Sequence, residues 1–95
     1  MENQHRKISG YRELSQEEID LMNRIKAKGA ELLDLHRELA QYLNKQHGQA
    51  VQDHPTGELA RLLEAEPKKW AAIGKTDIQT GIMALVRAVA QPEGV

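Results

Sequence analysis

The segment Ile8-Ser9-Gly10-Tyr11-Arg12 combines a flat aromatic ring with a guanidinium directly after a glycine. The Tyr11 ring offers a surface on which a base can stack, and Arg12 offers a planar fork of donors for a phosphate or a base edge. Gly10 gives the backbone unusual conformational freedom just before them. These residues favour a ligand that joins a base to an anionic group. A loop tyrosine more often anchors packing, and this alternative stays open.

Basic side chains elsewhere in the chain fit the same kind of ligand. Lys26 lies one position away from the apolar stripe of the helix expected after this segment, so it sits at the edge of a packed face. A lysine there can reach a bound anion, although an exposed lysine is more often only solvated. Lys68-Lys69-Trp70 is a second basic–aromatic group. The alternative interpretation makes Trp70 a core residue.

The remaining motifs argue against catalysis. Gly74-Lys75-Thr76 is similar to the end of a phosphate-binding P-loop, but Lys69 stands where the pattern requires its first glycine, and no strand is expected before it. A smaller hypothesis is that the first turn of a helix starting near Thr76 offers free N–H groups to an anion. No metal-binding spacing occurs among the histidines, which are His5, His36, His47 and His54. We therefore expect no catalytic set, metal or cofactor.

Length and composition limit the remaining classes. Ninety-five residues suffice for one small domain, and with 3% aromatic residues Leu, Ile, Val, Met and Ala must form its core. The absence of cysteine excludes a disulfide scaffold and cysteine zinc sites. No apolar run approaches the roughly 18 residues of a membrane span, and no signal region follows the N-terminus. The net charge of −1 argues against a DNA-coating protein. Together these features lead us to expect a cytosolic protein without a DNA or membrane partner.

The sequence predicts a long helix over residues 15–47. Ser15-Gln16-Glu17-Glu18 fits the S-x-x-E capping box, and Gly48 is expected to end the helix. Its apolar stripe alternates three- and four-residue steps, as one helix face requires, with Gly29 placed for close approach of another helix. A helix of about 30 residues is about 45 Å long. Because so small a chain cannot cover that face alone, we expect a second copy to cover it.

The rest of the chain is expected to be helical as well. The sequence predicts a linker over 48–56 and short helices over 57–70, with Leu59, Leu62 and Leu63 facing inward and Pro67 at a first helical position. Thr76-Asp77-Ile78-Gln79 fits a second capping box, which would open a last helix over 76–91. With 1–14 as a ligand-binding loop, residues 1–95 are expected to form a single all-α domain.

Two long stretches carry a resemblance to a known family. ISGYREL followed by EEIDLMNRIKAKGAEL, and W-x-x-IGKTDIQTGIMALVRAVAQP, closely resemble the small phage anti-CBASS proteins that sequester cyclic oligonucleotides. CBASS is a bacterial immune system that signals infection through cyclic di- and trinucleotides. The resemblance implies a helical subunit of a homo-hexamer in the host bacterial cytoplasm. It also implies tight binding without hydrolysis, which keeps the messenger from its effector.

The resemblance also assigns residues. Tyr11 would stack on a purine and Lys26 would neutralise a phosphate of a cyclic dinucleotide such as 3′,3′-cGAMP. The remaining candidates for this site are Gly10, Arg12, Thr76, Asp77 and Gln79. A separate site for a trinucleotide such as cyclic triadenylate would use Arg24, Lys28 and a basic residue near Trp70, which is Lys68 or Lys69. Two rival functions stay open, a helical adaptor that binds a host protein and a phosphodiesterase that destroys the messenger.

Overall fold

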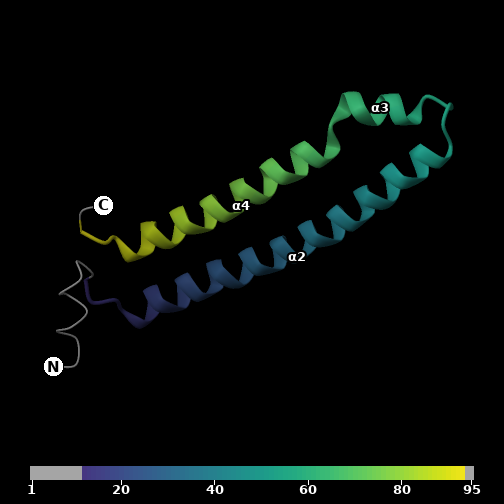
Figure 1. Ribbon diagram of the computed structural model, residues 1–95. Helices are drawn as coiled ribbons and strands as arrows, with labels where there is room; N and C mark the ends of the chain where they lie inside the picture. Colours follow the sequence, from purple (N-terminus) through teal and green to yellow (C-terminus); the bar gives the residue numbers. More distant parts are fainter. Residues whose placement is uncertain (1–11, 94–95) are drawn as a thin grey trace. The chain divides into compact units, whose positions relative to one another are not determined.

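The structure is a computed structural model, which describes residues 12–93. Three helices account for most of this range: α2 (Gln16–Gln52), α3 (Glu58–Ala65) and α4 (Pro67–Ala90) (Figure 1). No strand occurs among the described residues, so the predicted all-α class is confirmed. Although α2 and α4 are long, no helix in residues 12–93 combines length and apolar character in the way that crossing a membrane requires.

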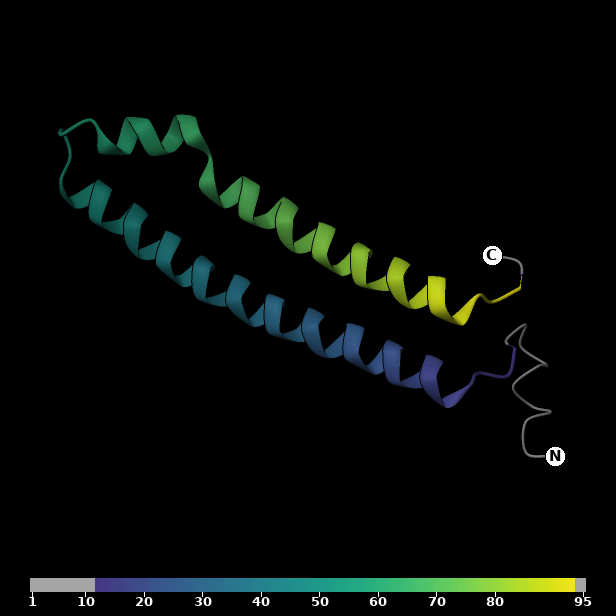
Figure 2. The same ribbon diagram turned by 180° about the vertical axis from the view of Figure 1, so that it is seen from behind.

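The chain divides into two compact units. The first unit joins residues 12–30, which include the start of α2, to residues 79–93, which include the end of α4. The second unit is Glu31–Ile78 and holds the rest of α2, all of α3 and the start of α4. Within each unit the α2 and α4 segments lie side by side in both views (Figures 1 and 2).

The predicted capping box at the start of α2 is confirmed. The Glu18 amide donates to Ser15 Oγ at 3.1 Å, and the Ser15 amide donates to Glu18 Oε1 at 2.8 Å. Each side chain thus satisfies a backbone N–H group that has no partner within the helix. Glu17 and Glu18 add negative charge at the positive end of the helix dipole.

The predicted end of α2 at Gly48 is wrong, because the helix continues to Gln52. Ala50 lies just beyond the glycine and is 1% exposed. A glycine inside a helix costs about 1 kcal/mol relative to alanine, and the packed turn around Ala50 offsets that cost. The non-helical connection therefore covers residues 53–57 instead of 48–56.

The predicted break before Thr76 is also wrong, because α4 runs without interruption from Pro67 to Ala90. Pro67 occupies the first helical position, as expected, after Glu66 ends α3 in a left-handed conformation. Thr76 Oγ1 donates to the Ala72 carbonyl at 3.3 Å, which is a contact inside a helix and not a cap. One half-buried face, formed by Ala71, Gly74 and Ile78, continues through the expected break and holds the helix together.

The short helix α3 turns one leucine inward and another outward. Leu62 is 5% exposed, whereas Leu63 is 64% exposed, so the expectation that Leu63 faces inward is wrong. Neighbouring positions on a helix differ by about 100° in direction. With packing on one side only, Leu59 and Leu62 share the covered face and Leu63 cannot join them.

Gly29 is buried in the first unit and lets α2 approach α4 closely, as its place in the stripe predicts. A Cβ atom built on Gly29 would lie 2.7 Å from Ile82 Cγ1 and even nearer to Ile82 Cδ1. The space that a Cβ would need is thus already filled by the Ile82 side chain. Glycine fits at this position because it has no side chain.

The Gly29→Ala variant is therefore expected to be less stable than wild type. Overpacking a well-filled contact costs about 1–3 kcal/mol, which exceeds the gain of about 1 kcal/mol in helix propensity. Urea denaturation followed by circular dichroism, at one fixed protein concentration, measures the change.

Gly81→Ala is the matched control. Gly81 is a helical glycine of the same unit, and a Cβ there would meet nothing within 4 Å. This variant should be as stable as wild type or more stable. A Gly29→Ala protein that equalled the Gly81→Ala protein in stability would show that the close approach does not constrain the fold.

Candidate ligand-binding site

Arg12 connects two helix ends in the first unit. Its Nη2 donates to the Val89 carbonyl at 2.8 Å and also forms an ion pair with Glu18 Oε2. Its Nη1 donates to Glu18 Oε1 at 3.4 Å. One side chain thereby joins the first turn of α2 to the last turn of α4.

These contacts help to satisfy the end of α4, where the last carbonyls have no partner within the helix. The Gln91 amide donates to the Arg87 carbonyl at 2.8 Å, and Gln91 Nε2 donates to the Ala88 carbonyl at 3.2 Å. Arg12 supplies the donor for the Val89 carbonyl. A cation at this end of a helix is also favoured by the helix dipole.

The carboxylate of Glu18 is held in its charged form. The hydrogen bond from Arg12 and, after it, the backbone hydrogen bond from Ser15 together lower the pKa of Glu18 from 4.5 to about 2. Charged donors stabilise a carboxylate relative to its protonated form. Glu18 therefore remains an anion well below neutral pH, and its pairing with Arg12 persists.

The basic candidates on α2 lie in the first unit together with Arg12. Arg24, Lys26 and Lys28 are exposed, and Gln79 of α4 is exposed in the same unit. Lys26 lies between half-buried Ile25 and buried Gly29. It therefore sits at the edge of the packed face, which is the place expected from the spacing of the stripe.

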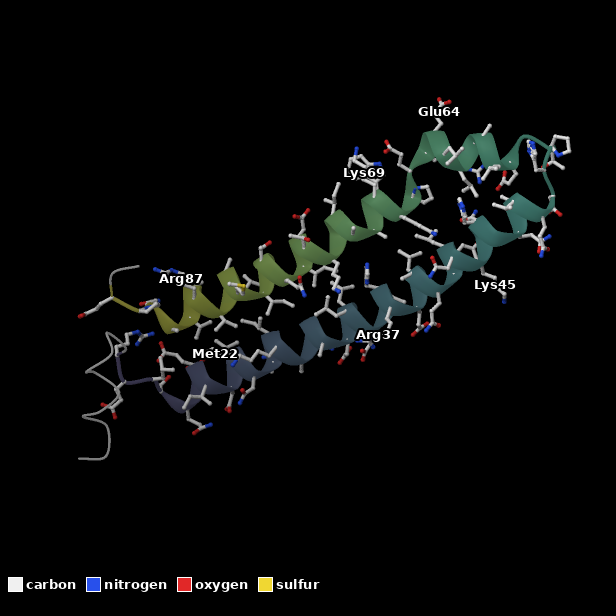
Figure 3. All side chains as sticks on the ribbon, viewed as in Figure 1. Met22, Arg37, Lys45, Glu64, Lys69 and Arg87 are labelled. Atoms are coloured by element: carbon white, nitrogen blue, oxygen red, sulfur yellow. The ribbon has the colours of Figure 1, made fainter. Side chains whose placement is uncertain are left out.

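The other candidates lie in the second unit. Thr76 and Asp77 are exposed inside α4, where the backbone N–H groups are used by the helix. The hypothesis that a helix starting at Thr76 offers free N–H groups is therefore wrong. Lys68 and Lys69 are exposed in the first turn of α4, and Figure 3 shows Lys69 on the side of α4 that faces away from α2. Lys69 Nζ lies 5.6 Å from the centroid of the Trp70 ring.

Gly10 and Tyr11 lie outside the described residues. Arg12 is the chain neighbour of Tyr11 and is the described residue nearest to it in sequence.

An open apolar groove in the second unit was not expected. It has a volume of about 480 Å³ and lies between α2 and α4. Trp70 is 61% exposed at the groove, so the alternative interpretation of Trp70 as a core residue is wrong. The signal in the sequence was Leu35, which lies beside the alternating apolar stripe of α2 and widens it. The groove is lined by Leu32, Leu35, His36, Leu39, Leu43, Pro67, Trp70, Ala71, Gly74 and Ile78.

Polar side chains of the described residues form no metal-binding cluster. No group of three or more histidine, aspartate or glutamate side chains in residues 12–93 is placed to hold a metal ion. His36 lines the apolar groove, and its Nε2 lies 3.0 Å from the Ala71 carbonyl.

Comparison with known proteins identifies the family. The Acb2/Tad1 hairpin domain matches residues 5–90. The chain belongs to the Acb2/Tad1 hairpin family. Anti-CBASS protein 2 of Pseudomonas phage JBD67 is 56% identical to it over 107 aligned residues, covering 99% of each chain. The resemblance to anti-CBASS proteins is thereby confirmed, and the Acb2/Tad1 match also includes residues 34–69, where the motifs are weaker.

The Arg12–Glu18 contact should make the stability of the fold depend on pH in the acid range. Because the pKa of Glu18 is lower in the folded protein than its ordinary value of 4.5, the contact stabilises the fold above pH 4.5. This contribution is lost as the pH falls towards about 2. Glu18→Gln keeps a capping side chain but loses the charge, so it should be less stable than wild type at pH 6. The two proteins should converge near pH 2.

Thermal unfolding followed by circular dichroism across this pH range measures the difference. Glu64→Gln serves as the control, because Glu64 is an exposed carboxylate on α3 whose side chain points outward (Figure 3). A difference between wild type and Glu18→Gln that stayed constant from pH 6 to pH 2 would contradict the role given to the Glu18 charge.

Proposed function

We propose that this protein binds cyclic dinucleotides such as 3′,3′-cGAMP, holds them without hydrolysis, and so blocks CBASS signalling in the host bacterial cytoplasm. The observation that carries the proposal is its similarity, over nearly its whole length, to a phage protein named for action against CBASS. The phage relative also supports action inside a bacterial host. The ligand follows from the messengers that CBASS uses.

Tyr11 and Lys26 are proposed as the principal ligand residues. Lys26 is exposed at the edge of the packed face in the first unit. Arg12, the chain neighbour of Tyr11, is held in that same unit by Glu18 and Val89. A stacking ring and a mobile cation match the two components of a cyclic dinucleotide, which are flat bases and phosphates.

The energetics favour a site closed by more than one subunit. Two base stacks at about 1–3 kcal/mol each and two charge-assisted phosphate contacts at about 1.5–3 kcal/mol each total about 5–12 kcal/mol before costs. Nanomolar affinity needs about 12 kcal/mol net. A preformed pocket that is closed between two copies of the chain would reduce the cost of ordering.

Self-association into a homo-oligomer, which we propose to be a hexamer, is supported by the exposed apolar side chains of the second unit. Leu35 is 57% exposed and Trp70 is 61% exposed along the apolar groove. Monomeric proteins rarely leave such contiguous apolar surface uncovered. Further exposed apolar side chains of the same unit are Leu32, Leu39, Tyr42, Val51, Leu63 and Ile73.

A second ligand, a cyclic trinucleotide such as cyclic triadenylate, is proposed for the basic residues outside the dinucleotide site. Lys68 and Lys69 are exposed beside the exposed ring of Trp70, which supplies a further stacking surface. Arg24 and Lys28 are exposed on α2 and would contribute from their own unit.

Titration calorimetry with 3′,3′-cGAMP, followed by heat release of the ligand and chromatography, tests the function. Tight binding and recovery of intact ligand are expected. Linear product would instead identify a phosphodiesterase. Absence of heat with both 3′,3′-cGAMP and cyclic triadenylate would favour an adaptor that binds a host protein.

Tyr11→Ala and Lys26→Ala should each weaken capture of 3′,3′-cGAMP by about 10- to 100-fold, because each removes about 1–3 kcal/mol of stacking or charge interaction. The oligomer should remain intact in size-exclusion chromatography with light scattering. Lys45→Ala, which removes an exposed lysine of α2 in the second unit, is the control. Wild-type affinity in the two site variants would show that the dinucleotide binds elsewhere.

Leu35→Glu should reduce the oligomeric mass, because a charge would then have to be buried where the apolar groove meets its partner. Light scattering measures the mass directly. Gln41→Glu introduces the same side chain at an exposed position of α2 outside the groove and should leave the mass unchanged. An intact oligomer in Leu35→Glu would show that the groove is not an interface.

A further inference from the structure

We propose that the second unit holds a separate site for a small organic acid, an aliphatic carboxylate or phosphate, in the pocket where α2, α3 and α4 meet. The pocket has a volume of about 300 Å³, at the lower end of the range of about 300–1,000 Å³ that is usual for small-molecule sites. All of its lining residues belong to the second unit. The inference goes beyond the proposed function, because it involves no cyclic oligonucleotide.

The most buried part of the pocket lining is apolar. Leu43 of α2 is 8% exposed and Leu62 of α3 is 5% exposed, and both line the pocket together with Pro67 of α4. None of these three side chains offers a hydrogen-bonding group. A polar group of a ligand would lose its hydrogen bonds to water there without replacing them. The part of the ligand that enters this region must therefore be apolar.

Leu63 extends the apolar lining to the surface of the protein. Its side chain is 64% exposed, although its chain neighbour Leu62 is buried. Both leucines line the pocket. An aliphatic chain that contacts Leu62 and Leu63 would remove apolar surface from water on both sides of the contact, which favours binding.

The polar part of the lining carries an excess of positive charge. Glu66, Lys68 and Lys69 all line the pocket. Glu66 and Lys69 compensate each other, because Glu66 Oε1 lies 3.7 Å from Lys69 Nζ. The same ammonium lies 5.6 Å from the centroid of the Trp70 ring. Lys68 is exposed and has no ion-pair partner among residues 12–93, so it supplies the uncompensated charge.

His47 adds a second donor to the pocket from another helix. It lies half-buried on α2, whereas Lys68 lies in the first turn of α4, and both residues line the pocket. The ring nitrogens of His47 have no hydrogen-bond partner in the part of the chain that the structure describes. An ammonium and an imidazole N–H can each donate to an oxygen of a carboxylate or phosphate. The lining thus matches an acid group joined to an apolar chain.

Titration calorimetry with butyl, hexyl and octyl phosphate tests the apolar half of the site. Each CH₂ group that becomes buried strengthens binding about fourfold, so affinity should rise about tenfold from butyl to hexyl phosphate. Octanoate should bind as well, and the tighter of octanoate and octyl phosphate identifies the acid group. Inorganic phosphate that bound as tightly as octyl phosphate would overturn the proposal.

The charged half of the site is tested with octanol and octyltrimethylammonium. Both have the same chain as octyl phosphate, but one lacks the charge and the other reverses it. Each should bind at least about tenfold more weakly, because a hydrogen bond to a charged group contributes about that much. Equal affinity for octanol and octyl phosphate would show that the basic residues play no part, and the proposal would fail.

Lys68→Ala and Leu63→Ala separate the two contributions. Both side chains are exposed, so both variants should keep the helical circular dichroism of wild type. Lys68→Ala should lose about tenfold in affinity for octyl phosphate and less than twofold for octanol. Leu63→Ala should weaken both ligands about fivefold. Wild-type affinity for octyl phosphate in either variant would overturn the site.

Lys75→Ala and Leu35→Ala are the matched controls. Lys75 is an exposed lysine of α4 in the second unit, and Leu35 is an exposed leucine of the apolar groove, and neither lines the pocket. Both variants should bind octyl phosphate as wild type does. If Leu35→Ala lost as much affinity as Leu63→Ala, the chain would be binding in the apolar groove, and the proposal would be wrong.

The same variants keep this site distinct from the proposed dinucleotide site. Leu63→Ala should bind 3′,3′-cGAMP with the affinity of wild type. If wild type binds octyl phosphate but no cyclic dinucleotide, the pocket is upheld while the proposed function fails. If it binds 3′,3′-cGAMP but none of the alkyl acids, the proposed function stands and the pocket is rejected.

Discussion

In a pair of helices, each helix can bury only the face that meets the other one, and this limit on burial holds in both units of the protein. The buried side chains among residues 12–93 are few and small or medium in size, namely Leu43, Ala50, Leu62 and Ala90. With so little core, close contact matters more than the amount of apolar surface, which is why α2 has a glycine beneath Ile82. The apolar residues beside the packed faces stay exposed in the single chain, and this exposure is the physical basis for proposing self-association.

Favourable charge interactions are found at the ends of the helices. Glu18 lies at the positive end of α2, and Arg12 lies at the negative end of α4, so each charge is favoured by a helix dipole as well as by the other. The same pair satisfies backbone groups that would otherwise lack partners.

Local sequence patterns predicted helix starts correctly where a side chain acts on the backbone near it. They predicted helix breaks wrongly where packing against distant residues holds the helix together. Ser15 and Glu18 form the predicted capping box, and Pro67 occupies a first helical position. The same kind of reasoning placed helix breaks at Gly48 and before Thr76, and both are absent. A glycine weakens a helix by only about 1 kcal/mol, so the packed faces on either side carry the helix through it.

The sequence by itself determined the all-α class, the start of α2, the place of Gly29 on the packed face and the family, because these depend on short-range patterns and on residue identity. Tertiary structure decided the lengths of α2 and α4, the exposure of Leu63 and Trp70, and the partners of Arg12. No local pattern could foresee that Arg12 meets a carbonyl 77 positions away. That contact exists only because the packing of the two helices brings the end of one beside the beginning of the other.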